Sequence, residues 1–216
     1  MNDTWRAELL LFDFDGTLID SKVDIANAVN QTLEALDLPQ RTHEEIFSFV
    51  GDGVKRLLRL SVGEQNTGQY EQALEIFRGH YLRECVATTR LYPGIWEVLH
   101  HYKDVKKAIV TNKSLEYTMA IVEGLQIQSL FEEIVGPQDS TELKPEPAML
   151  ERVMAKVRMD PSRTVMIGDS TNDVRAAQAL DMRACAVGYG YGNRERVQAL
   201  EPDFYCERPQ DLIGQF

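Results

Sequence analysis

The sequence Leu9-Leu10-Leu11-Phe12-Asp13-Phe14-Asp15-Gly16-Thr17 decides the fold of this 216-residue chain. Its apolar run is typical of a strand buried on both faces, at the centre of a parallel sheet. Because side chains alternate along a strand, Asp13 and Asp15 would lie on the same side if the extended backbone continued. Gly16 lets the chain turn away at the strand's carboxyl end, where open α/β sheets bind ligands.

The two carboxylates of this stretch require an explanation. At a separation of about 4 Å they repel by roughly 4 kcal/mol at an effective dielectric constant near 20. A hard divalent cation relieves that repulsion, and Mg²⁺ does so while leaving coordination positions for phosphate. An ordinary acidic turn is the alternative, and the flanking apolar run and Gly-Thr favour the metal over it.

Composition excludes several functional classes. The formal net charge of −11 disfavours binding to a nucleic-acid backbone or an anionic membrane surface. The three cysteines are scattered and form no Cys-x-x-Cys pair, which favours reduced thiols over a disulfide framework or a zinc site. Residues 1–8 lack the apolar segment of a signal peptide, and no stretch is long enough to span a bilayer. We therefore expect a cytoplasmic protein that binds neither nucleic acid nor membrane.

The chain changes its hydrophobic period after Ser21. Apolar residues recur at helical spacing through residues 20–85, with a capping-box pair at Thr42 and Glu45, and no convincing strand occurs there. From Leu91 onward, apolar strand-like runs alternate with helical patterns; the runs are 107–111, 133–135, 164–167, 184–187 and 203–205. This alternation indicates βαβ units and a parallel sheet.

We therefore expect an α/β fold in two parts. Residues 1–19 and 86–216 would form a Rossmann-like parallel sheet flanked by helices. Residues 20–85 would form a helical unit inserted after the first strand. At 216 residues, the length suits one domain with a sizeable insertion.

Polar side chains follow the other strands as well. Thr111 and Asn112 come directly after one apolar run, and Asp169 and Asp173 follow another. Prolines flank Lys144 on a segment between them. Each group has an ordinary alternative: a strand-to-helix turn, a helix N-cap or a surface lysine. Together they bring four carboxylates, including Asp13 and Asp15, to one sheet edge with a single fixed cation, which requires a metal ion.

These segments resemble the phosphatase branch of the haloacid dehalogenase superfamily. Asp-x-Asp-Gly-Thr, Thr-Asn, Lys-Pro and Gly-Asp-(x)₃-Asp occur in the family's order and at compatible spacing over nearly the whole chain. The resemblance implies that Asp13 attacks phosphorus, forming an aspartyl phosphate, and that Asp15 acts as general acid and then general base. It further implies that Thr111 and Asn112 hold phosphoryl oxygens and that Lys144 offsets the charge of Asp13 and the phosphoryl group.

The resemblance also implies a Mg²⁺ site and a cap. Asp13, the backbone carbonyl of Asp15 and Asp169 would hold the metal, with Asp173 supporting it directly or through water. Residues 20–85 would be the cap that closes over the site and selects the leaving group. Asp15 favours phosphate chemistry, because a dehalogenase needs no proton donor to an alkoxide.

The cap suggests where substrate specificity arises. Gly51-Asp52-Gly53-Val54-Lys55-Arg56 is a turn entering a helix, and Lys55 and Arg56 could bind a substrate carboxylate or be solvated surface charges. This loop, 91–94 and the glycine-rich 187–192 look most like phosphoglycolate phosphatases. Related pyrophosphatases, sugar-phosphate phosphatases and phosphosugar mutases stay open, as does a phosphoaspartate signalling module. The partner expected is a small phosphorylated metabolite; the oligomeric state, monomer or homodimer, stays open.

Overall fold

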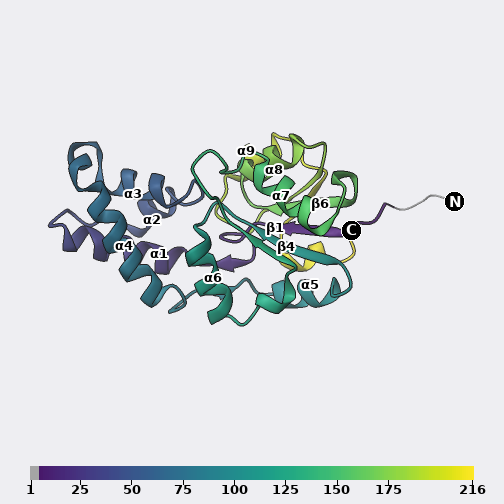
Figure 1. Ribbon diagram of the computed structural model, residues 1–216, viewed down its shortest axis with the longest axis horizontal. Coiled ribbons are helices and arrows are strands. Elements are labelled where there is room, and N and C mark those ends of the chain that lie inside the picture. Colours follow the sequence, from purple (N-terminus) through teal and green to yellow (C-terminus); the bar gives the residue numbers. More distant parts are fainter. Residues whose placement is uncertain (1–4) are drawn as a thin grey trace.

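A six-stranded parallel sheet forms the centre of the computed structural model, which describes residues 5–216 (Figure 1). Its order is β5-β4-β1-β6-β7-β8, so β1 (Leu9–Phe12) pairs with β4 and β6. The other strands are β4 (Lys106–Val110), β5 (Glu133–Val135), β6 (Thr164–Gly168), β7 (Arg183–Val187) and β8 (Phe204–Cys206). The predicted α/β fold with a parallel sheet is confirmed. Residues 1–4 of the predicted sheet-forming part lie outside the described residues.

Side-chain alternation along β1 divides the interior into two layers. Leu10 and Phe12 belong to one buried cluster, and Leu9 and Leu11 belong to the other. Helices α5 (Ile95–His101) and α6 (Leu115–Gly124) cover the first face; α7 (Ala148–Val157), α8 (Thr171–Gln178) and α9 (Arg194–Gln198) cover the second (Figure 1). With helices on both faces, β1 is fully buried, as its apolar sequence predicts.

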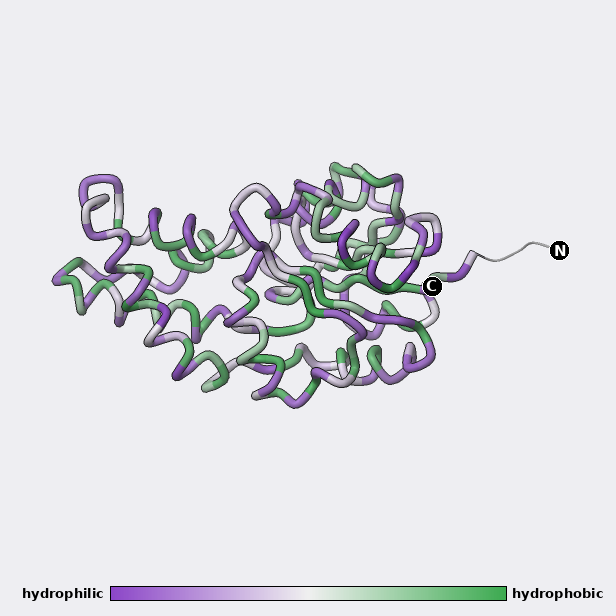
Figure 2. Tube along the Cα trace, viewed as in Figure 1, coloured by the Kyte–Doolittle hydropathy of each residue, from purple (hydrophilic) through white to green (hydrophobic). Residues whose placement is uncertain are grey.

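The segment after β1 forms a helical unit at one end of the molecule (Figure 1). It contains α1 (Lys22–Ala35), α2 (His43–Phe47), α3 (Val54–Val62) and α4 (Tyr70–Glu84). The predicted capping box is present: Thr42 Oγ1 accepts from the Glu45 N–H, and Glu45 Oε2 accepts from the Thr42 N–H. Apolar residues line the inner faces of these helices (Figure 2). None of the helices within residues 5–216 has the length and apolar character required to cross a bilayer.

Two connections join the helical unit to the sheet, and they lie side by side. The two-residue strands β2 (Ile19–Asp20) and β3 (Arg90–Leu91) pair antiparallel. Sequence analysis did not predict β2. A strand of two residues is too short to show the alternation of apolar and polar residues by which strands are recognised. Short 3₁₀ helices complete the chain at Glu64–Gln69, Gln128–Leu130, Pro161–Arg163 and Pro209–Leu212.

A buried carboxylate fastens the two connections. Asp24, in the first turn of α1, accepts hydrogen bonds from the backbone N–H and the hydroxyl of both Thr88 and Thr89, at 2.6–3.0 Å. Burial alone would raise the pKa of Asp24, but these hydrogen bonds outweigh it and lower the pKa below its usual value. The start of the helical unit is thereby tied to the segment that returns to the sheet.

Candidate active site

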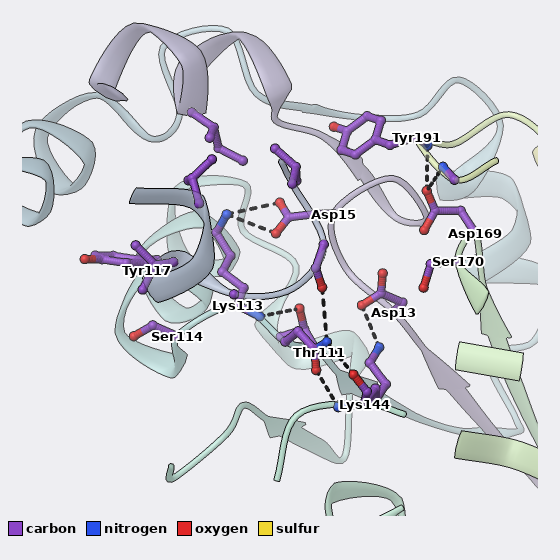
Figure 3. Close-up of a pocket in the computed structure, with 18 of the residues that line it drawn as sticks. Asp13, Asp15, Thr111, Lys113, Ser114, Tyr117, Lys144, Asp169, Ser170 and Tyr191 are labelled. Carbon is purple, nitrogen blue, oxygen red and sulfur yellow. Dashed lines mark hydrogen bonds and ion pairs between the residues drawn. The ribbon is translucent and has the colours of Figure 1, made fainter. Parts of the chain in front are cut away.

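The carboxyl end of the sheet brings together most of the predicted site residues. Asp13 directly follows β1, Thr111 follows β4, and Asp169 follows β6. All three line one pocket together with Asp15 and Lys144 (Figure 3). Since neighbouring parallel strands end at the same edge, residues about 150 positions apart in sequence meet here.

Lys144 connects the polar residues of the pocket through three hydrogen bonds. Its ammonium group donates to Asp13 Oδ1 at 2.8 Å, to Asp173 Oδ1 at 2.6 Å and to the Val110 carbonyl oxygen at 2.6 Å. The lysine side chain is only 2 % exposed. Burial alone would lower the pKa of Lys144, but Asp13 and Asp173 outweigh it and raise the pKa, so the lysine is charged.

One lysine does not balance the neighbouring carboxylates. Burial, reinforced by Asp173 and Asp169 and opposed by Lys144, raises the pKa of Asp13 to about 8. Burial and Asp173 likewise raise the pKa of Asp169 to about 7, although two backbone N–H groups oppose the shift. The site therefore holds more negative charge than its protein partners stabilise.

This excess of charge fits a divalent cation. Carboxylate oxygens of Asp13, Asp169 and Asp173 lie within 4.8 Å of one another, and all three residues are buried. A hard cation such as Mg²⁺ prefers oxygen ligands of this kind. The carboxylate of Asp15 does not belong to this group. The ligand predicted from Asp15 is its backbone carbonyl oxygen, and that contact stays a prediction.

A glycine-rich loop holds Asp169 in place. Asp169 Oδ2 accepts hydrogen bonds from the backbone N–H groups of Tyr191 and Gly192, at 2.5 and 3.0 Å. A Cβ atom at Gly192 would lie 1.9 Å from the Asp169 carbonyl oxygen. Gly16, with φ of +85°, approaches from the other side, where a Cβ would lie 2.4 Å from Asp169 Oδ2. Sequence analysis noted this loop only for its glycines and its resemblance to phosphoglycolate phosphatases, and did not predict its contact with Asp169.

Asp15 has partners that differ from those of Asp13. The Ser21 hydroxyl donates to Asp15 Oδ1 at 2.5 Å. Lys113 Nζ lies 3.0 Å from Asp15 Oδ2 (Figure 3). Sequence analysis singled out Thr111 and Asn112 after this strand and assigned no role to Lys113. Strand alternation was the available signal, because Thr111 and Lys113 are two residues apart and would face the same side.

Thr111 and Asn112 differ in what they offer a ligand. The Thr111 hydroxyl accepts a hydrogen bond from the Lys113 N–H and has no acceptor of its own within residues 5–216, so it can donate. The Asn112 amide donates to the carbonyl oxygens of Gly51 and Lys144 and accepts from the Lys144 N–H. The predicted contact of Asn112 with phosphoryl oxygens therefore stays a prediction, and its observed contacts join the helical unit to the Lys144 segment.

The two cationic residues predicted on the helical unit do not line the pocket. Gly51, Gly53 and Val54 do line it. Lys55 and Arg56 are exposed, and Arg56 pairs with Asp52 at 3.0 Å. The structure thus brings this loop to the site without the side chains of Lys55 and Arg56.

Comparison with known proteins agrees with this geometry. The model of the haloacid dehalogenase-like hydrolase family matches residues 10–187, so the chain belongs to that family. The match begins in β1 and ends with β7, and thus includes every polar strand end of the pocket. Within this family the chain is a phosphatase.

The names of similar proteins specify a substrate, which the name of the family does not. The phosphoglycolate phosphatase of Colwellia psychrerythraea is 34% identical over 215 residues, covering 95% of each chain. That of Aquifex aeolicus is 32% identical and covers 95% of this chain and 94% of its own. The crystal structure of a predicted phosphoglycolate phosphatase from Haemophilus somnus has a TM-score of 0.89 at 28% identity and covers 97% of both chains.

Proposed function

We propose that this phosphatase hydrolyses a small phosphate monoester in a Mg²⁺-dependent reaction, with 2-phosphoglycolate as the preferred substrate. The observation that carries the proposal is the buried group of three carboxylates and one lysine beside Asp15, at the carboxyl end of the sheet. The names of the relatives support the choice of substrate.

In the proposed reaction, Asp13 and Asp15 divide the work. An oxygen of Asp13 attacks phosphorus, and the bond from phosphorus to the ester oxygen breaks as the new bond forms. Asp15 gives its proton to the departing oxygen, so that glycolate leaves as the alcohol. Asp15 then takes a proton from water, which attacks the aspartyl phosphate and releases inorganic phosphate, returning Asp13 to its carboxylate form.

The surrounding groups hold the phosphoryl oxygens and the metal. The Thr111 hydroxyl can donate to a phosphoryl oxygen, and the positive charge of Lys144 would offset the charge of Asp13 and of the phosphoryl group. Asp13, Asp169 and the Asp15 carbonyl would hold Mg²⁺, with Asp173 in support. When bound, Mg²⁺ neutralises negative charge on the phosphoryl group and keeps it in line with the attacking oxygen.

The helical unit has a role of its own in this proposal. Residues 20–85 would be a cap domain that closes over a core formed by residues 1–19 and 86–216, and it would exclude water from the reaction. The three cysteines are free and buried, which supports a location in a reducing cytoplasm. The charge of −11 supports a protein that binds neither nucleic acid nor an anionic membrane.

A substrate panel tests the proposal. With Mg²⁺, we expect release of inorganic phosphate, with a higher kcat/KM for 2-phosphoglycolate than for pyrophosphate, sugar phosphates or nucleotides. Removal of the metal with a chelator should abolish turnover, and added Mg²⁺ should restore it. Isomerised phosphosugar without phosphate release would indicate a mutase. A phosphoaspartate that survives for hours, with no turnover of any ester, would indicate a signalling module.

A further inference from the structure

The pocket contains two cationic side chains with different surroundings. Among its lining residues within 5–216, only Lys113 and Lys144 carry a fixed positive charge. Lys144 is fully engaged, because it donates to two carboxylates and one carbonyl oxygen. The ammonium group of Lys113 contacts a single carboxylate, that of Asp15. Its side chain is 7 % exposed, so this charge is held inside the pocket rather than in solvent.

A second polar group nearby has no protein partner. Tyr81, on α4, lines the same pocket and is 1 % exposed. Its hydroxyl is buried and makes no hydrogen bond within the described chain. A buried polar group of this kind is uncommon and usually has a water or ligand partner. Burial, and next the Asp15 carboxylate, raise the pKa of Tyr81 well above its usual value, so the hydroxyl keeps its proton and can donate it.

The two groups lie close together. Lys113 Nζ is 4.7 Å from the centre of the Tyr81 ring. Tyr81 belongs to the helical unit and Lys113 to the loop after β4, so the pair spans the two parts of the molecule. The ring itself is fixed by Phe77 and Tyr117, at centroid distances of 5.2 Å each. A cation and a free hydroxyl are therefore held in position by packed aromatic side chains.

Electrostatics limits what this pair can bind. The pocket already contains Asp13, Asp15, Asp169 and Asp173, so an anionic group on the leaving alcohol would be repelled unless a cation received it. The exposed Lys55 and Arg56 do not line the pocket. Lys113 is the cation in place, and the Tyr81 hydroxyl, buried without a partner on a ring that lines the same pocket, is available as a donor.

We propose that Lys113 and Tyr81 bind the carboxylate of the substrate's leaving group and thereby set the preference for 2-phosphoglycolate over uncharged esters. This inference rests on the proposed function and adds the residues that recognise the substrate. In the bound state Lys113 Nζ pairs with the substrate carboxylate, which takes the place of Asp15 as its anionic partner while Asp15 carries the proton for the leaving group. The Tyr81 hydroxyl donates to the substrate carboxylate.

The test compares two substrates in one variant. Ethyl phosphate has the same ester group as 2-phosphoglycolate but no carboxylate. Lys113→Met should lower kcat/KM for 2-phosphoglycolate between about 10- and 100-fold more than for ethyl phosphate, the range expected for loss of a hydrogen bond to a charged group. An effect that acts through Asp15 should lower kcat/KM for ethyl phosphate at least as much, because ethanol is the poorer leaving group. A loss selective for 2-phosphoglycolate therefore reports carboxylate binding. Lys103→Met, an exposed substitution in the turn before β4, should leave the ratio unchanged.

Tyr81→Phe provides a second, milder variant. It removes only the unpartnered hydroxyl and should lower the ratio roughly three- to ten-fold, as expected for one neutral donor to a carboxylate. Inhibition by inorganic phosphate, which has no carboxylate, should be the same in the wild type and both variants. If Lys113→Met does not fold, the proposal is tested with Tyr81→Phe alone, by its ratio of kcat/KM for 2-phosphoglycolate to kcat/KM for ethyl phosphate.

Two negative results have different meanings. A wild type that prefers 2-phosphoglycolate, with variants that keep its ratio to ethyl phosphate, overturns the roles of Lys113 and Tyr81 and leaves the proposed function standing. A wild type with no preference for 2-phosphoglycolate over ethyl phosphate overturns the proposed substrate, and the carboxylate site with it. If pyrophosphate is preferred and Lys113→Met lowers its hydrolysis selectively, the pair binds a second phosphate and the carboxylate assignment is wrong.

Discussion

The two sides of the pocket are built from opposite kinds of residue. On the sheet side, buried carboxylates surround Lys144. On the side of the helical unit, the lining is apolar and aromatic, with Ile25, Val54, Leu57, Phe77 and Tyr81. The sheet side therefore carries the charges that act on a phosphoryl group, while the helical side provides shape and a few directed contacts. The sheet side thus provides the groups of the proposed chemistry, whereas the proposed selection combines Tyr81 of the helical side with Lys113 of the loop after β4.

The two sides also differ in what they contribute to stability. Removing charged groups from water is costly, and their mutual attraction only partly offsets the cost. Burial of an apolar side chain, in contrast, stabilises by about 1.5–3 kcal/mol. On the sheet side we therefore expect substitutions to change activity more than stability. We expect the reverse at the joint, by which we mean Asp24 with Thr88 and Thr89, because the hydrogen bonds to Asp24 lie outside the pocket and compensate its burial.

Asp13→Asn should have the largest effect and tests the sheet side. The amide has nearly the shape of the carboxylate but is a poor nucleophile, so kcat should fall by roughly 10⁴-fold or more. The free energy of unfolding should stay the same or rise, because one of the three crowded carboxylates loses its charge. Steady-state kinetics and urea denaturation measure the two quantities. Retained activity would remove Asp13 from the mechanism.

Asp24→Asn should have an intermediate effect and tests the joint. Asparagine keeps one acceptor oxygen, but its amide nitrogen cannot accept the hydrogen bonds that the second carboxylate oxygen receives from Thr88 and Thr89. We therefore expect a loss of about 2 kcal/mol in the free energy of unfolding at neutral pH. Asp104→Asn, at an exposed position, is the matched control and should change stability by less than about 0.5 kcal/mol. An equal change in the free energy of unfolding for Asp24→Asn and Asp104→Asn would show that the hydrogen bonds to Asp24 do not stabilise the fold.

The pH dependence of the Asp24 effect has a definite sign. The pKa of Asp24 is lowered in the folded state, so ionised Asp24 stabilises the fold above its unfolded pKa of about 3.9. That contribution is lost as the pH falls through the lower folded pKa. The stability difference between wild type and Asp24→Asn should therefore be full at pH 7 and shrink below about pH 4. A difference that grows on acidification would contradict this assignment.

Tyr191→Phe should have the smallest effect and tests the link between the two sides. The Tyr191 hydroxyl accepts from the Ser21 N–H at 2.7 Å and donates to Asp20 at 2.9 Å, while its backbone N–H holds Asp169. The substitution keeps the backbone donor and should cost about 1 kcal/mol of stability. Tyr205→Phe is the control, because the Tyr205 hydroxyl has no hydrogen-bond partner within residues 5–216. A larger loss in the control would contradict the link.

The contrast between the two sides also explains which residues of the pocket could be predicted from the sequence alone. Asp13, Thr111 and Asp169 each follow an apolar run directly, so knowing the strand is enough to place the residue. Contacts from the helical side depend on how helices pack, which a single sequence does not contain. Tyr81 fell within the helical pattern of residues 20–85 and Tyr191 within the glycine-rich 187–192, and sequence analysis assigned a role to neither side chain.

Helix α3 illustrates the same limit. Lys55 and Arg56 stand in its first turn, where a ligand carboxylate was expected. Its buried positions include Leu57, Leu58 and Ser61, and this spacing turns the side chains of 55 and 56 to the opposite, exposed face. The position along the sequence was close to the pocket, but the direction of the side chains was set by the periodicity of the helix.

The pairing of β2 with β3 has a consequence for how such proteins diversify. Because the helical unit leaves and rejoins the sheet at adjacent points, its length and sequence can change without altering the spacing of the strands. Asp24, Thr88 and Thr89 all lie between the two short strands, so a transplanted segment from Asp20 to Arg90 would bring its own fastening with it. Exchange of the helical unit at the paired strands β2 and β3 would leave the sheet unchanged and would alter the residues that face the substrate from the helical side.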